Sequence, residues 1–181
     1  MGVTVRGKES LLAKLNNLPK AIEQASKDAT WELTDDVLSK TQLSIQSSAK
    51  HSSGELAGSY QNEVVVTGGN KIVGRVWSDK MQAIFFEFGT GEVGQESQKD
   101  LPEGINPVYT QGRWFFPVDS VDRDLNALYG MPVIEIQGTE FYMTRGQPAH
   151  PALYPALKEV SEYAEEVYAE HIDKAVRDLA D

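Results

Sequence analysis

The chain has 181 residues, 40% of them hydrophobic, and its 27 acidic and 17 basic side chains give a formal charge of −10. This length suits one hydrophobic core, so a single domain spanning residues 1–181 is expected. The negative charge disfavours nucleic-acid binding through phosphate contacts. The lack of cysteine excludes disulfides, thiolate nucleophiles and sulfur-ligated metals. No apolar run approaches the roughly 18 residues of a membrane span, and the N-terminus lacks a signal core, so a soluble, non-exported protein is expected.

A helical rhythm runs from about residue 8 to residue 49. Apolar and small side chains recur there at spacings of three and four, which is the period of one helix face. Pro19 interrupts the pattern, and proline is favoured in a first helical turn because it lacks a backbone donor. We therefore expect a short helix, a break after Asn16-Asn17, and a long helix from about Pro19 to Ala49.

A β-hairpin is predicted next. The β-branched runs 63–67 and 72–77 flank Gly68-Gly69-Asn70, and glycine reaches positive φ without steric cost. Residues 79–82 then offer a capping-box start for a helical turn. The apolar face of that turn would carry Met81, Ile84, Phe85 and Phe88.

Residues 91–111 have no apolar period and are long for a connection, so we expect a mobile, functional loop. A strand is predicted over residues 113–118, and a second hairpin over 133–136 and 141–144. The last 30 residues keep one face apolar and predict a long amphipathic helix. The sum is an α+β fold, in which a long N-terminal and a long C-terminal helix pack with an antiparallel sheet of about four to five strands.

The sequence gives little sign of chemistry. The three histidines, His51, His150 and His171, have no second histidine or cysteine at ligand spacing, so a zinc site is not expected. No cofactor is expected either. Ser52 and Ser53 stand beside His51 but without the glycine-flanked turn of a nucleophile. Gly89-Thr90-Gly91 lacks the further glycine and lysine of a phosphate loop.

Glu87 is the one carboxylate with the apolar neighbours of a buried catalytic acid, since Phe86 and Phe88 flank it. On a helical turn, however, Glu87 points away from the apolar face. An ordinary solvated side chain is therefore the alternative interpretation.

Three separated segments resemble one family, the tail-completion or head-tail joining (neck) proteins of long-tailed phages. Residues 53–60 (SGELAGSY) are similar to its T/S-G-x-L pattern before a strand, and residues 86–91 (FEFGTG) to its E-F/Y-G-T signature after a hairpin. Residues 144–157 (TRGQPAHPALYPAL) resemble the T-x-G-x-x-A-x-P-F-L-x-P-A-L segment before the C-terminal helix. Two departures are Ala152 in place of the usual phenylalanine and a longer stretch between Gly91 and Gly146.

The resemblance implies a structural protein without catalytic activity or cofactor. It would form a ring, usually hexameric, at the virion head-tail junction after assembly in the host cytoplasm. Its partners would be further copies of itself, a head-closure or connector protein and the tail-tube protein, with DNA passing through without specific binding and no membrane involved. The alternatives are a tail terminator that caps the tail tube, an acid-catalysed hydrolase centred on Glu87, and a binding module with a mobile loop.

Candidate interface residues follow from the matched segments. The glycines would mark positions where backbone conformation or close approach excludes a side chain, and Phe86 or Phe88 could anchor a neighbouring subunit. Ordinary core and turn packing is the alternative for each. A head-to-tail ring needs two different patches per subunit, and the 91–111 loop could supply one. The candidates are Gly54, Leu56, Phe86, Glu87, Phe88, Gly89, Thr90, Gly91, Gln147, Pro148, His150 and Pro151.

Overall fold

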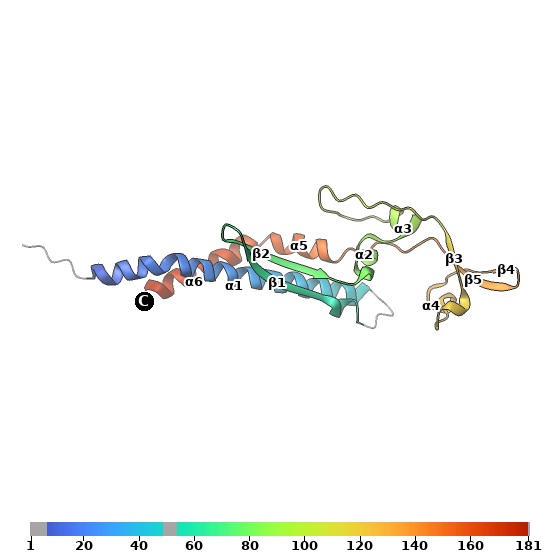
Figure 1. Cartoon of the computed structure of the whole chain (residues 1–181), viewed down its shortest axis with the longest axis horizontal. Helices are drawn as coiled ribbons and strands as arrows, with labels where there is room; N and C mark the ends of the chain where they lie inside the picture. Colours follow the sequence, from blue (N-terminus) through green and yellow to red (C-terminus); the bar gives the residue numbers. More distant parts are fainter. Residues whose placement is uncertain (1–6, 49–53, 181) are drawn as a thin grey trace, which may run out of the picture. The chain divides into compact units, whose positions relative to one another are not determined.

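The computed structural model describes residues 7–48 and 54–180 (Figure 1). Its contacts group into two compact units, one made of Met1–Ser78 with Pro155–Asp181 and the other of Asp79–Tyr154. Folding of residues 1–181 as a single domain stays a prediction. The sequence signals at His51, Ser52 and Ser53 lie outside the described residues.

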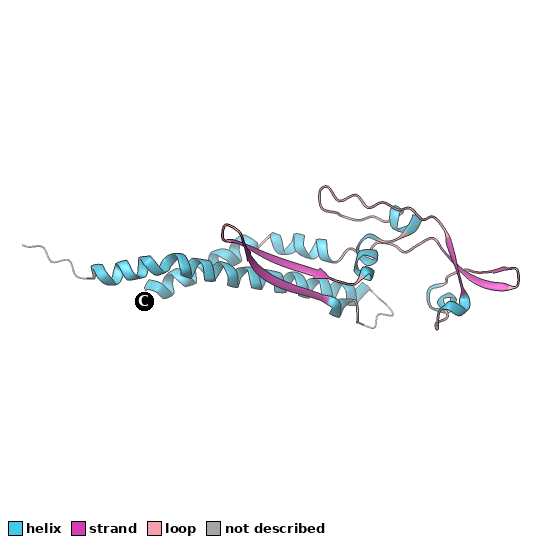
Figure 2. Ribbon diagram, viewed as in Figure 1, coloured by secondary structure: helices cyan, strands magenta, loops and turns pink. Residues whose placement is uncertain are grey.

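The first unit is built around one long helix. Helix α1 (Lys8–Ser48) lies beside α6 (Ala164–Ala180), and the hairpin β1 (Tyr60–Thr67) and β2 (Lys71–Ser78) also packs against α1 (Figures 1 and 2). A short 3-10 turn, η1 (Ala57–Ser59), leads into β1. The strands pair antiparallel from Tyr60 opposite Ser78 to Thr67 opposite Lys71, which confirms the predicted first hairpin.

Small side chains give α1 its packing face. Its buried residues recur at helical spacing and include Ala25, Ala29, Leu33, Val37 and Ile45. The buried threonines on this face return their hydroxyls to the helix, as when Thr41 Oγ1 donates to the carbonyl of Val37 at 2.7 Å. Burial of these polar groups is therefore compensated by hydrogen bonds within α1.

The predicted helix break at Pro19 is wrong, because α1 continues through this proline. Proline inside a helix costs about 3 kcal/mol, so the neighbouring turns must be held by other contacts. Lys14 Nζ donates to the carbonyl of Ala180 at 2.5 Å on one side of the proline, and Thr30 shares a 2.7 Å hydrogen bond with Tyr168 on the other. Helix α6 thus supports α1 on both sides of Pro19.

The C-terminal helical region is divided in two. Helix α5 (Leu153–Ser161) and α6 are separated by a turn at Glu162 and Tyr163. In that turn Tyr163 donates from its hydroxyl to Asp36 of α1 at 3.0 Å, and burial together with this hydrogen bond raises the pKa of Tyr163. The turn is thereby tied to α1.

The second unit contains three short helices and a small sheet. The helices are α2 (Met81–Phe88), α3 (Gly91–Glu96) and α4 (Leu125–Tyr129), with a 3-10 turn η2 (Val118–Ser120). Strands β3 (Trp114–Pro117), β4 (Val133–Ile136) and β5 (Thr139–Thr144) form an antiparallel sheet in the order β3-β5-β4. The predicted strand after the loop and the predicted second hairpin are both present.

The α+β class, the long N-terminal helix and a C-terminal helix are confirmed. A single helix over the last 30 residues is wrong, because α5 and α6 are separate, and one sheet of four to five strands is also wrong. The described strands form a two-stranded and a three-stranded sheet (Figure 2). Sequence periodicity identifies strands but carries no information about which strands pair across long separations. Here the first hairpin packs on α1, whereas β3, β4 and β5 pair only with one another.

Two local predictions in the second unit also change. The N-cap of α2 is Lys80, without a side-chain cap bond, so helix α2 starts one residue too late for a capping box led by Asp79. Residues 91–96 of the expected loop form α3, whereas residues 97–113 have neither helix nor strand. Mobility of residues 91–111 stays a prediction.

Among the described residues, no helix is both long and apolar enough to cross a bilayer.

Candidate functional site

The buried face of helix α2 is not the apolar face that its sequence pattern predicts. Ala83 and Glu87 are its buried residues, whereas Met81, Ile84 and Phe85 are 66%, 57% and 42% exposed. Met81, Ile84 and Phe85 therefore point outward, and the single carboxylate of the helix points inward. A buried carboxylate requires hydrogen-bond donors, so its surroundings decide its role.

The Glu87 carboxylate caps the beginning of α5. Its Oε2 accepts hydrogen bonds from the amides of Ala152 at 2.7 Å and Leu153 at 3.1 Å, and its Oε1 accepts one from the amide of Tyr154 at 3.1 Å. The first amides of a helix have no partner within the helix, and its N-terminus favours negative charge. The next residue, Pro155, has no amide hydrogen. Glu87 thus satisfies the free donors of the first turn of α5.

A second set of contacts joins the segment after α2 to the segment before α5. The amide of Thr90 donates to the carbonyl of Gln147 at 3.0 Å, and the amide of Gln147 donates back to Thr90 Oγ1 at 3.1 Å. The amide of His150 donates to the carbonyl of Phe86 at 2.8 Å, and the two rings lie 5.4 Å apart. Residues 86–94 and 145–154 therefore form one hydrogen-bonded crossing, hereafter the 86–94/145–154 crossing.

Glycines allow the backbones of the two segments of this crossing to lie close together. A Cβ on Gly89 would lie 2.7 Å from the Ala149 nitrogen and the Gln147 oxygen, and Gly89 also has φ of +73°. A Cβ on Gly146 would overlap the carbonyl of Thr90, and Gly146 has φ of +102°. At both positions an L side chain is excluded by space and by backbone conformation.

An ion-pair cluster covers one end of the crossing. Arg145 Nε donates to Glu92 of α3 at 2.7 Å, and its guanidinium lies 3.7 Å from Glu96. The hydrogen bond to Glu92 and the two negative charges raise the pKa of Arg145. The groups are exposed enough for solvent screening, so we assign this cluster an orienting role for α3 rather than a large share of stability.

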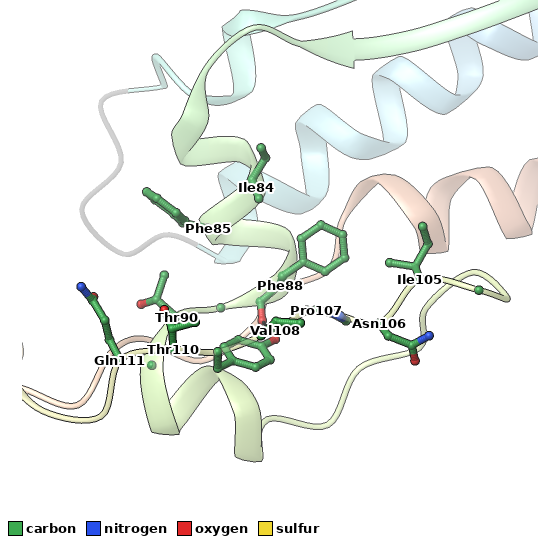
Figure 3. A pocket seen from close by; sticks show the side chains of 14 residues that line it. Ile84, Phe85, Phe88, Thr90, Ile105, Asn106, Pro107, Val108, Thr110 and Gln111 are labelled. Carbon is green, nitrogen blue, oxygen red and sulfur yellow. Dashed lines mark hydrogen bonds between the residues drawn. The ribbon is translucent and has the colours of Figure 1, made fainter.

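A groove of about 510 Å³ lies between α2, the start of the crossing and residues 104–111 (Figure 3). Ile84, Phe85 and Phe88 reach it from α2, and Ile105 and Val108 reach it from the loop. The hydroxyl of Tyr109 donates to the carbonyl of Phe88 at 2.6 Å, which fixes the far wall. The groove is lined mainly by apolar side chains and glycines, and none of its lining residues is charged.

The structure brings together most of the residues singled out from the sequence. Those in 86–91 and Gln147 to Pro151 all belong to the second unit, and they meet in the crossing or beside it. Gly54 and Leu56 belong to the first unit, where the Gly54 carbonyl accepts from Gly58 at 2.9 Å and begins the turn before β1. A Cβ on Gly54 would meet no atom, so φ of +77° alone favours glycine there.

Several residues of the site are not indicated by the sequence. Gly94, Ser97, Tyr109 and Arg145 carry contacts of the crossing or the groove, and no local pattern marks them. Gly146 stands in the third matched segment but is not among the candidate site residues predicted from the sequence. The sequence Pro151-Ala-Leu-Tyr-Pro155 is the available signal, because proline is tolerated in the first turn of a helix and so marks a helix start, where the remaining amides need acceptors.

The described part of the chain contains no group of three or more side chains suited to holding a metal ion. Comparison of the chain with protein-family models, curated proteins and solved structures gives no match. The residues of the crossing and the groove are therefore the basis for assigning a function.

Proposed function

We propose that this chain is a structural protein of the phage head-tail junction, where rings of it complete the tail and join the tail tube to the head-closure complex. The observation that carries the proposal is the 86–94/145–154 crossing. It unites the two more specific segments that resemble the tail-completion family, although residues 91 and 144 are far apart in the sequence.

The residue types of the two segments have physical reasons within the crossing. Glu87 supplies an acceptor for three amides, and Gly89 and Gly146 leave room for the opposite backbone. Residues of each segment are thus required for contacts with the other segment. Such mutual dependence favours a shared structural role of the two segments over a chance similarity. Family membership is thus supported by the interdependence of the motifs.

The hydrolase alternative has less support. A general acid must offer a proton to a substrate within hydrogen-bond reach. Both carboxylate oxygens of Glu87 accept hydrogen bonds from backbone amides, and the residue is only 8% exposed. This environment suits a structural anion better than a catalytic acid.

Surface properties of the described residues also suit a ring component. Exposed apolar side chains occur on α1, with Leu11, and on α2, with Ile84, and a head-to-tail ring requires two different patches on each subunit. The net charge of −10 suits a passage along which DNA slides without adhering.

The test is assembly in a phage whose copy of this gene carries a stop codon. Electron microscopy of the infected-cell lysate should show filled heads separated from tails of normal length, and the full chain supplied from a plasmid should restore joined virions. Intact virions without the protein would refute the proposal. Separated tails of uncontrolled length would instead identify a tail terminator, since a terminator stops tube polymerisation.

The predicted role of the 91–111 loop can be tested in the same system. Residues 91–94 belong to the crossing, Ser97 accepts a hydrogen bond from the amide of Ala149, and Tyr109 anchors the loop. The deletion should therefore be confined to residues 101–107. The shortened chain should remain folded but fail to support head-tail joining. Normal joining by a folded, shortened chain contradicts this role.

A further inference from the structure

The first turns of α1 carry an apolar ridge that is left uncovered in the described structure. The first buried residue of α1 is Ala25, and Leu11, Leu12 and Leu15 are 59%, 48% and 52% exposed. Leu11, Leu15 and the half-buried Leu18 follow one another at spacings of four and three, so they lie on one helix face. We refer to Leu11, Leu12, Leu15 and Leu18 as the leucine ridge.

The groove of the second unit has the complementary form. Its α2 wall carries Ile84 and Phe85, and its loop wall carries Ile105 and Val108, which are 46% and 84% exposed. A groove with apolar walls and no charge in its lining accepts the apolar face of a helix, whose anchors recur at i, i+4 and i+7. The leucine ridge has this spacing.

Charge favours the same pairing. Residues 7–20 around the ridge carry three lysines and one glutamate, although the whole chain is strongly acidic. Residues 79–154, which contain the groove, carry eleven acidic and five basic side chains. Exposed Glu103 adjoins the groove-lining Gly104. A locally basic helix end therefore meets an acidic unit, which speeds and orients encounter.

We propose that the leucine ridge of one copy of this chain docks in the groove of a second copy. Each copy then contributes its ridge to one neighbour and its groove to another, a heterologous contact that closes into a ring or extends into a filament. A three- or four-leucine contact is small, so a single pair associates weakly and closure supplies the remaining affinity. The inference supplies a contact for the proposed ring but depends only on these two surfaces.

Disulfide trapping tests the contact directly, because the full chain has no cysteine. One copy with Leu15→Cys and a second, differently tagged copy with Val108→Cys are mixed and mildly oxidised. Leu43→Cys replaces Leu15→Cys in the control, since Leu43 is a 65% exposed leucine of the same helix outside the ridge. We expect about tenfold more heterodimer from the Leu15 pair than from the Leu43 pair, because docking raises the local thiol concentration.

A third arm alters the groove without touching the cysteines. Ile84→Asp in the Val108→Cys copy should reduce the heterodimer to the Leu43 control level, because it places an unpaired charge against the leucines. Ile84 is exposed, so this variant should keep its fold, which circular dichroism checks.

Three results would overturn the proposal. The first is equal trapping by the Leu15 and Leu43 pairs, and the second is a predominance of disulfides between two Leu15→Cys copies, which would indicate ridge-to-ridge pairing. The third is a double variant, Leu15→Cys with Val108→Cys, that closes only within one chain at all concentrations. Because trapping needs no phage, its failure would leave the head-tail assembly experiment unaffected, and the reverse also holds.

Discussion

The carboxylate of Glu87 accepts a 2.7 Å hydrogen bond from the amide of Ala152, which lies 65 positions later in the sequence. It is the shortest of three amide contacts made by the same side chain. A single carboxylate near the end of α2 therefore caps the beginning of α5.

Removal of this carboxylate should loosen the crossing. We expect Glu87→Ala to cost about 2–4 kcal/mol, because three amides lose a charged acceptor. Glu87→Gln should also destabilise, since the amide group replaces one acceptor oxygen with a donor. Hydrogen exchange of peptides covering residues 144–157 measures the effect, and protection should fall in both variants.

Glu96→Gln is the matched control for Glu87. Its carboxylate is 71% exposed and lies 3.7 Å from Arg145, so its loss should change stability by no more than about 0.5 kcal/mol. Equal protection in Glu87→Ala and Glu96→Gln would show that the buried cap contributes nothing.

Gly146 should tolerate alanine far less than Gly138 does. Both have positive φ, +102° and +79°, and both variants incur backbone strain of about 1 kcal/mol. Only at Gly146 would the new methyl overlap the Thr90 carbonyl, whereas Gly138 has open space. Urea unfolding should show Gly146→Ala to be at least about 2 kcal/mol less stable than Gly138→Ala. Similar values for the two variants would contradict the close crossing of the backbones.

The local elements of the fold could be predicted well from the sequence. The Gly68-Gly69-Asn70 turn announces the first hairpin, and it indeed contains positive φ at Gly69 and Asn70. The helical period of residues 22–45 likewise predicts the buried face of α1. These signals depend only on neighbouring residues, so they do not change with the contacts made by the rest of the chain.

The predictions that depended on distant residues were less successful. Pro19 reads as a helix break until α6 is known to support both sides of it. Phe85 reads as a buried residue of α2, but Glu87 is buried instead because its acceptors are needed by amides from residues 152–154. Neither partner can be identified from the local pattern. The resemblance segments did mark the crossing, although not the contacts that build it.

The contact between Gly74 and Thr34 gives a test of how β2 packs on α1. A Cβ on Gly74 would overlap the Thr34 methyl and lie 3.0 Å from that of Thr30. Gly74→Ala should therefore cost about 1–3 kcal/mol through overpacking. Thr34→Ser removes the nearest methyl but keeps the hydroxyl, so the double variant should recover about 1 kcal/mol relative to additivity.

Gly68→Ala serves as the control for the double-mutant cycle of Gly74 and Thr34. A Cβ on Gly68 would meet nothing within 4 Å, and φ of Gly68 is not positive. This control variant should change the free energy of unfolding by no more than about 0.5 kcal/mol. Strict additivity of Gly74→Ala and Thr34→Ser in urea unfolding would show that the helix and the strand do not meet at these residues.

Tyr163 should make the stability of the protein fall at alkaline pH. Burial, followed by the hydrogen bond to Asp36, raises the pKa of its phenol in the folded state above the ordinary value near 10. Its contribution is therefore fully present below about pH 10 and is lost as pH rises through the folded-state pKa, because the unfolded chain releases the proton first.

Two variants isolate this contribution in urea unfolding at pH 8 and at pH 10.5. Tyr163→Phe should lower the free energy of unfolding by about 1 kcal/mol at pH 8, because the hydrogen bond is missing. Between the two pH values, however, its free energy of unfolding should fall less than that of the wild type. Asp36→Asn keeps the phenol and removes the negative charge that helps raise its pKa, so its decline should be intermediate. If all three proteins decline equally, Tyr163 is not the group that couples folding to alkaline pH.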